Sequence, residues 1–255
     1  MSVLLNFPLV IFALSFVVLW LSEWFGASFR QKRGNLEEDD RDDFSLIAAA
    51  TLTLLGLIIG FSFSMAISRY DQRKNYEEAE ANAIGTEYVR ADLLPSTDGA
   101  KTRALLRKYL DQRILFYETR DNRELQQINA ATAQLQANLW SVAQAPAMAQ
   151  PTPVIALAVS GMNDVLNSEG YTQAAWWNRI PSAAWSLMAT IAVCSNFLIG
   201  YGVRHSEKKI PLFLILPLVV SISFFLIADI DSPRSGIIRV RPQNLESLSQ
   251  SLRAD

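Results

Sequence analysis

The residues and motifs that form three common kinds of functional site are scarce or missing in this sequence of 255 residues. The only cysteine is Cys194, which leaves no partner for an intrachain disulfide and no set of thiolates for a metal cluster. The only histidine is His205, so a Ser-His or Cys-His catalytic pair would have to use that one ring. Its position in a short basic segment is more typical of a solvated imidazole. No Gly-rich phosphate loop, Walker pattern or dinucleotide fingerprint is present.

The sequence also lacks an excess of charge of either sign. It has 23 Lys and Arg against 25 Asp and Glu, and its basic residues form no patch interleaved with aromatic side chains. Such a balance argues against a nucleic-acid partner. We therefore expect no nucleic acid, no cofactor and no bound metal, and we do not expect an enzyme.

Charge is missing altogether from four stretches of about 19 to 24 residues, namely 3–21, 44–67, 183–203 and 210–228. Each is long enough to cross a hydrocarbon core of about 30 Å as a helix rising about 1.5 Å per residue. This pattern excludes a soluble globular protein. The first stretch lacks a basic leading segment and exceeds the usual apolar core of a secretory signal, so we interpret it as a membrane span.

Elsewhere the periodicity is helical, and no window alternates convincingly at the period of a strand. The sequence thus predicts an all-α protein with four transmembrane helices and a helical extramembrane domain inserted between spans two and three. The expected segments are a first span at 1–22, a charged loop at 23–43, a second span at 44–67, a helical stalk and bundle at 68–182, a third span at 183–203, a basic connector at 204–209, a fourth span at 210–228 and a tail at 229–255.

The second span carries small residues at four-residue steps, Gly56, Gly60 and Ser64. This spacing places them on one helical face, where they allow another helix to approach closely in lipid. No helix-breaking turn follows before Pro95, so we expect one helix over 44–94 that leaves the membrane as a stalk.

Residues 60–73 read Gly-Phe-Ser-Phe-Ser-Met-Ala-Ile-Ser-Arg-Tyr-Asp-Gln-Arg, and the tail contains Asp-Ile-Asp-Ser-Pro-Arg-Ser-Gly at 229–236. Together with the stalk pattern over 78–95, these motifs resemble a bacterial bestrophin-like membrane protein family of unknown function. That family is distantly similar to the bestrophin anion channels. The likeness to the first family covers most of the chain, whereas the link to bestrophins depends on residues 60–73 and on the layout of spans.

The resemblance to bestrophins implies a homo-oligomer, a pentamer, in which the second spans line a pore for small anions. The matching neck positions are Thr53, Leu57 and Phe61, which share one helical face. Leu57 and Phe61 suit an apolar constriction that excludes water, whereas Thr53 departs from the apolar pattern. Only Asp229 and Asp231 correspond to the calcium-binding run of animal bestrophins, so we do not expect calcium gating.

Several charged residues near the span ends allow two interpretations. Arg69 and Arg73 either reach lipid phosphates or form a ring of cations at a pore mouth. Asp229 and Asp231 follow the last span, where a helix C-terminus already disfavours negative charge. We expect them to form an ion-pair clasp with Arg69, Arg73 or Arg234 rather than a metal site. Further along the stalk, we expect three carboxylates to be solvated rather than to form a cation pathway, namely Glu77, Glu80 and Glu87.

Three classes of function remain. An oligomeric anion channel requires the small and apolar face of the second span to surround an axis. A non-conducting scaffold or sensor, whose helical domain binds a partner, would use the same small face to pack its own four spans. A membrane enzyme would need Asp229 and Asp231 to hold a metal, and no second acidic motif supports it. We favour the channel.

The orientation is not decided by charge, because Lys and Arg are balanced across the two sides of the spans. The dense clusters at 30–33 and 204–209 favour a periplasmic helical domain, and the bestrophin layout favours a cytoplasmic one. We expect a multi-pass protein of the bacterial inner membrane with its helical domain in the cytoplasm.

Overall fold

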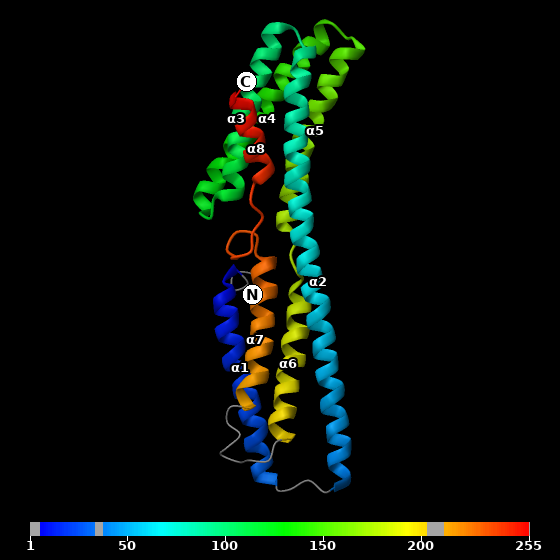
Figure 1. Cartoon of the computed structure of the whole chain (residues 1–255), viewed down its shortest axis with the longest axis vertical. Coiled ribbons are helices and arrows are strands. Elements are labelled where there is room, and N and C mark those ends of the chain that lie inside the picture. Colours follow the sequence, from blue (N-terminus) through cyan, green and yellow to red (C-terminus); the bar gives the residue numbers. More distant parts are fainter. Residues whose placement is uncertain (1–5, 34–37, 203–211, 255) are drawn as a thin grey trace. The chain divides into compact units, whose positions relative to one another are not determined.

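The computed structural model describes residues 6–33, 38–202 and 212–254 (Figure 1). Within these residues the chain is helical and contains no strand. The helices are, in order, α1 (Pro8–Arg33), α2 (Glu38–Arg90), the short 3₁₀ helix η2 (Ala91–Leu93), α3 (Ser96–Glu118), α4 (Asn122–Ala149), α5 (Pro153–Trp177), α6 (Ser182–Gly202), α7 (Leu212–Asp231) and α8 (Gln243–Ala254).

The chain forms two compact units, and each contains two separate pieces of sequence. Unit 1 consists of residues 1–68 and 179–239, and unit 2 consists of residues 69–178 and 240–255. The boundary falls inside α2, so this single helix of 53 residues contributes its first part to unit 1 and its second part to unit 2. The continuous helix expected across 44–94 is confirmed as far as Arg90, where α2 ends and η2 begins.

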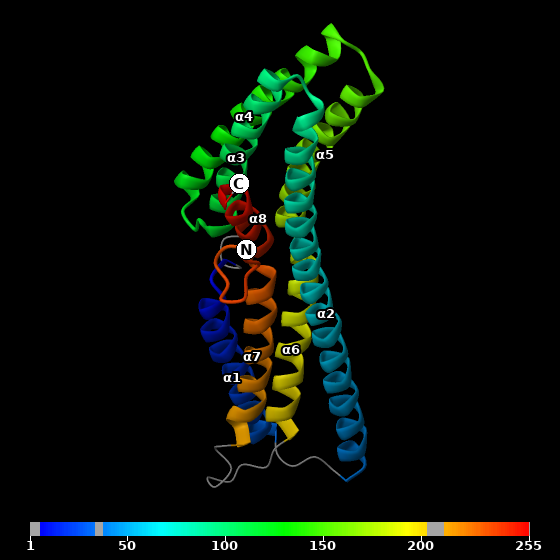
Figure 2. The ribbon, with the colours of Figure 1, turned by 45° about the horizontal axis from the view of Figure 1, so that its top comes forward.

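In unit 1, α1, α6 and α7 lie side by side (Figures 1 and 2). Two glycines set the contact between α1 and α6. A Cβ atom added to Gly200 would lie 1.9 Å from the backbone oxygen of Glu23, and one added to Gly26 would lie 2.1 Å from that of Phe197. Ser22 donates a hydrogen bond to the Val193 carbonyl at 2.8 Å. Backbones this close allow no side chain, so the α1–α6 pair depends on both glycines.

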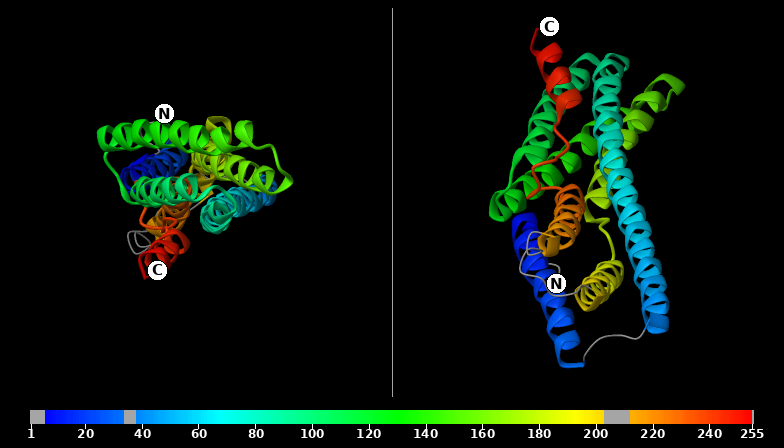
Figure 3. Two further views of the ribbon diagram at one scale, coloured as in Figure 1. Left: turned by 90° about the horizontal axis from the view of Figure 1, so that it is seen from above. Right: turned by 60° about the horizontal axis from the view of Figure 1, so that its bottom comes forward.

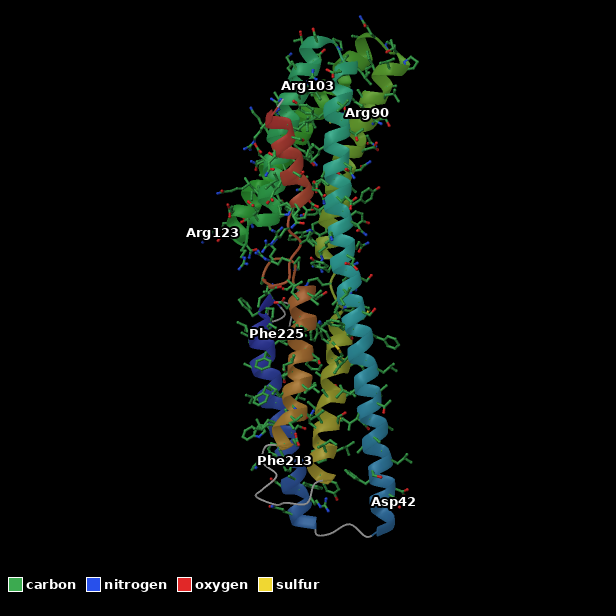
Figure 4. All side chains as sticks on the ribbon, viewed as in Figure 1. Asp42, Arg90, Arg103, Arg123, Phe213 and Phe225 are labelled. Carbon is green, nitrogen blue, oxygen red and sulfur yellow. The ribbon has the colours of Figure 1, made fainter. Side chains whose placement is uncertain are left out.

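Aromatic rings join the remaining helices of unit 1. Phe225 of α7, labelled in Figure 4, meets Phe12 of α1 edge to face with centroids 6.4 Å apart. At the other end, Phe44 of α2 packs on Tyr201 of α6 at 5.5 Å. Arg30 donates to the carbonyls of Tyr201 and Gly202, which are left free where α6 ends.

Unit 2 is a bundle of the second part of α2 with α3, α4, α5 and α8. Helices α3 and α4 pack against each other, and α8 lies along α3 (Figure 3). The core is formed by fully buried apolar side chains from all five of these helices, including Ile84, Leu106, Leu110, Leu139, Met162 and Leu245. In the sequence, apolar residues recur at helical spacing over 100–119, 125–142 and 155–166, and each of these three stripes includes fully buried side chains.

The structure differs from the sequence-based expectations in two places. The segment at 23–43, expected as a loop, is helical at both ends, because α1 runs to Arg33 and α2 begins at Glu38. The tail is divided, since residues 229–239 belong to unit 1 while α8 packs into unit 2. The basic connector at 204–209, with His205, lies outside the described residues.

Four helical segments are long and apolar enough to cross a membrane, judged by length and composition. They are Pro8–Gln31, Asp42–Leu93, Pro153–Gly202 and Phe213–Asp231, and each contains one of the charge-free stretches or most of it.

Candidate functional site: the open face of α2

The apolar part of α2 has two distinct sides. One side is buried in unit 1 and carries Ala48, Leu55, Ser62 and Ala66, of which Leu55 is only 2% exposed. These positions are separated by seven, seven and four residues, as expected for one face of a helix. The opposite side is exposed, although its residues are as apolar as those of the buried side.

The three predicted neck positions lie on the exposed side. Leu57 is 53% exposed and Phe61 is 62% exposed, and Thr53 is exposed as well. The Thr53 hydroxyl donates to the Ala49 carbonyl at 2.8 Å within the same helix. Its hydrogen-bonding potential is thus satisfied locally, which reduces the polarity that Thr53 brings to an otherwise apolar row.

The three predicted small positions are also open. A Cβ atom added to Gly56 or to Gly60 would meet no atom within 4 Å, and Ser64 is exposed. Within the part of the chain that the structure describes, the small face therefore packs no other helix. This contradicts the idea that Gly56, Gly60 and Ser64 serve to pack the chain's own spans, which instead use Gly26 and Gly200.

The motif at 229–236 folds into a tight structure after α7. The two Asp229 carboxylate oxygens accept hydrogen bonds from the backbone N–H groups of Ile237 and Ile238, at 2.7 and 2.8 Å. Gly236 is required here, because a Cβ atom at that position would lie 2.2 Å from the Asp229 carbonyl oxygen. The carboxylate of Asp229 thus closes the loop that follows the helix.

Asp231 binds the segment that precedes α6. Its oxygens accept the Ile180 backbone N–H at 3.1 and 3.3 Å, and Arg179 Nε lies 3.4 Å from Oδ2. Arg179 also donates to Asn6 and to Ser232. The cation that the structure places at Asp231 is Arg179, which was not among the three expected from the sequence.

The basic residues of the expected mouth or clasp differ in their surroundings. Arg69 Nε donates to Asn178 Oδ1 at 3.4 Å. Arg73 is only 2% exposed, which does not suit a cation facing an aqueous path, and Arg234 is partly buried. Among the described residues, no group of three or more His, Cys, Asp or Glu side chains could hold a metal.

The stalk carboxylates are not solvated, contrary to our expectation. Glu77, Glu80 and Glu87 are all at most 1% exposed. They recur at three and seven residues on α2, on the side that faces the helices of unit 2. The charge-rich composition of this segment concealed a buried face.

Each of the first two carboxylates has a defined partner. Glu77 accepts the backbone N–H groups of Asn244 and Leu245 at 2.9 and 3.0 Å, so it caps the start of α8. Glu80 forms a buried ion pair with Arg113 and also accepts from Thr172 at 3.1 Å. These contacts fix α3, α5 and α8 to α2.

The family model of the Bestrophin-like domain matches residues 9–245. These residues include α2, α7 and the motif at 229–236. The chain belongs to the Bestrophin-like family. Together with its apolar helices, this makes it a membrane protein. No match is found among curated proteins at the sequence level.

Solved structures share the fold. A bacterial bestrophin homologue from Klebsiella pneumoniae aligns with a TM-score of 0.67 at 13% identity, covering 95% of this chain and 97% of that one. Two single-residue variants of that homologue align at 12% identity. The tryptophan-to-alanine variant has a TM-score of 0.67, covering 95% and 94% of the two chains, and the leucine-to-threonine variant has a TM-score of 0.63, covering 95% and 98%. The Bestrophin-like chain therefore has the helical architecture of these proteins.

Proposed function

We propose that this Bestrophin-like protein is an oligomeric membrane channel that passes small anions through a pore lined by α2. The observation that carries the proposal is the exposed apolar row Thr53, Leu57 and Phe61, flanked by open glycines. An exposed apolar row could simply contact lipid, and by itself it does not require a protein partner. The neighbouring Gly56 and Gly60, which pack nothing in the chain itself, favour contact with another copy of α2.

The proposed assembly is a homo-pentamer, by analogy with bestrophins. Five α2 helices would place two apolar side chains from each copy around the axis, one helical turn apart. Rings of Leu57 and Phe61 at that spacing would form a narrow neck that excludes water until it widens. Arg69 lies two turns beyond Phe61 and would raise the local anion concentration at the mouth; Arg73, being buried, is not part of this mouth.

The proposal includes the orientation of the chain in the membrane. The charge-free stretches would cross the bacterial inner membrane, and the bundle at 68–182 would form a cytoplasmic domain inserted between spans two and three. We propose a transport protein rather than an enzyme. The proposed partners are the lipid bilayer, further copies of the chain and small anions.

Purified protein reconstituted in liposomes tests the conduction, and native mass measurement in detergent tests the assembly. The expected results are a chloride flux above that of empty liposomes and a mass of five chains. A monomer without flux would contradict the channel and leave a non-conducting scaffold. An oligomer without flux at several pH values would retain the assembly and reject conduction.

A further inference from the structure

Glu87 stands apart from the other two stalk carboxylates because it has no hydrogen-bond partner. Its side chain is fully buried, and neither Oε1 nor Oε2 has a donor within reach. Glu87 lies 20 residues beyond the apolar stretch 44–67. The segment 68–94 around it contains ten charged side chains, which exclude this part of α2 from hydrocarbon. An ionised carboxylate in this position would lose its hydration and gain no hydrogen bond in return.

The lid over Glu87 is the backbone of α5. A Cβ atom added to Gly161 would lie 2.0 Å from Glu87 Oε2 and 2.4 Å from Arg90 Nη1. Arg90, labelled in Figure 4, is on the same helix as Glu87. The side chains of α2 thus press directly on α5 where that helix has no side chain of its own.

Two charged groups act on Glu87, and they oppose each other. Burial, as the largest cause, raises the pKa of Glu87 to about 8; Arg90 lowers this pKa and Asp164 of α5 raises it. Asp164 is exposed and lies three residues after Gly161, on the same helix that covers Glu87. A negative charge on Glu87 would therefore be repelled from α5 in particular.

We propose that Glu87, Gly161 and Asp164 form a proton-controlled latch between α2 and α5. The protonated carboxyl stays buried under Gly161 and holds the first half of α5 on α2. The ionised carboxylate needs water around it, and water gains access to Glu87 when α5 separates from α2. The latch stands on contacts within unit 2 and does not depend on whether the protein conducts.

Hydrogen–deuterium exchange of the full-length protein in detergent between pH 5.5 and 9 tests the latch, with rates corrected for the intrinsic pH dependence of exchange. When α5 separates, Glu87 regains an ordinary carboxyl pKa. Protection of amides in 155–165 should therefore fall by up to about tenfold per pH unit as the pH rises towards 8, and then level off. A peptide from 105–117 in α3 reports global unfolding, which also exposes Glu87, so it should stay better protected than 155–165 at every pH.

Three variants decide the assignment. Glu87→Gln should abolish the pH-dependent loss, and Glu78→Gln, which removes an exposed carboxylate from the same helix, should behave as the wild type. Asp164→Asn should retain more protection than the wild type at pH 8, and this comparison holds even if Glu87→Gln folds poorly. The latch is rejected if protection in 155–165 is independent of pH, if it falls equally in Glu87→Gln, or if 105–117 exchanges as fast as 155–165.

Discussion

Single carboxylates in this protein act through the backbone N–H groups and cations that surround them. Asp229 and Asp231 lie in the last turn of α7, where negative charge is unfavourable, yet each accepts two backbone or side-chain donors. The oxygens of this motif are thus occupied by N–H donors, which removes the main reason to consider a metal ion there. The motif serves instead to join the end of α7 to the segment before α6.

Exchanging Asp231 for Asn tests this joint at the level of one pair. Asp231→Asn and Arg179→Gln should each lower the melting temperature, corresponding to about 1.5–3 kcal/mol for a hydrogen bond that involves a charged group. Because both changes break the same contact, the double variant should cost less than the sum of the single variants. Arg241→Gln, which removes an exposed cation from the tail, is the control. Additive effects would show that Asp231 and Arg179 are not coupled.

The buried Glu87 predicts an unusual pH dependence of stability. Its pKa is about 8 in the folded protein and near 4.5 when exposed, so the folded state binds more protons between these values. The free energy of unfolding should therefore fall as the pH rises from about 5 to 8. Glu87→Gln should flatten this decline, as measured by melting temperature in a series of buffers. A decline of equal slope in the variant would mean that other groups cause it.

At the scale of helices, the glycines separate two kinds of contact. Gly26 and Gly200 bring α1 and α6 into backbone contact, whereas Gly56 and Gly60 on α2 face open space within the chain. The sequence alone does not distinguish these pairs, because all four are small residues in apolar helices. Only the three-dimensional packing shows which glycines the fold needs and which remain available for another copy.

Adding one methyl group to Gly200 should therefore be costly. Gly200→Ala places a Cβ atom 1.9 Å from the Glu23 carbonyl oxygen, which forces α1 and α6 apart and should destabilise unit 1 by about 1–3 kcal/mol. Gly170→Ala in α5 meets no atom within 4 Å and should be neutral or slightly stabilising. Thermal melts of both variants in detergent provide the comparison. Equal melting temperatures would show that α1 and α6 can separate without loss.

Periodicity and the absence of charge predicted the four apolar helices, the long α2 and the three stripes of the bundle. They did not predict α8 or the helical ends of 23–43. These segments are polar, and they contain too few apolar residues for a helical period to be recognised. They also misassigned Glu77, Glu80 and Glu87 as solvated, because the burial of a carboxylate depends on packing partners that are distant in the sequence. Arg179 was missed for a related reason: its partner, Asp231, lies 52 residues away in the chain.

For the whole molecule, the decisive question is whether the open face of α2 surrounds an axis. Phe61 is 62% exposed in the single chain, so Phe61→Ala should leave no cavity and little loss of stability within a subunit. If the five rings form the neck, their removal should widen it and raise chloride flux into liposomes several-fold. Leu55→Ala is the matched control on the same helix. Leu55 is 2% exposed, so its truncation should cost about 2–5 kcal/mol and give no gain in flux.

The two measurements must be made on the same preparations, because flux alone does not distinguish a wider pore from a damaged protein. A rise in flux at an unchanged melting temperature for Phe61→Ala, with the opposite result for Leu55→Ala, would place Phe61 at the axis. If Phe61→Ala instead lowers the melting temperature of the oligomer and leaves flux unchanged, Phe61 packs between subunits rather than in the pore. The apolar row would then be a contact surface that holds the assembly together, and the conducting path would have to be sought along another face.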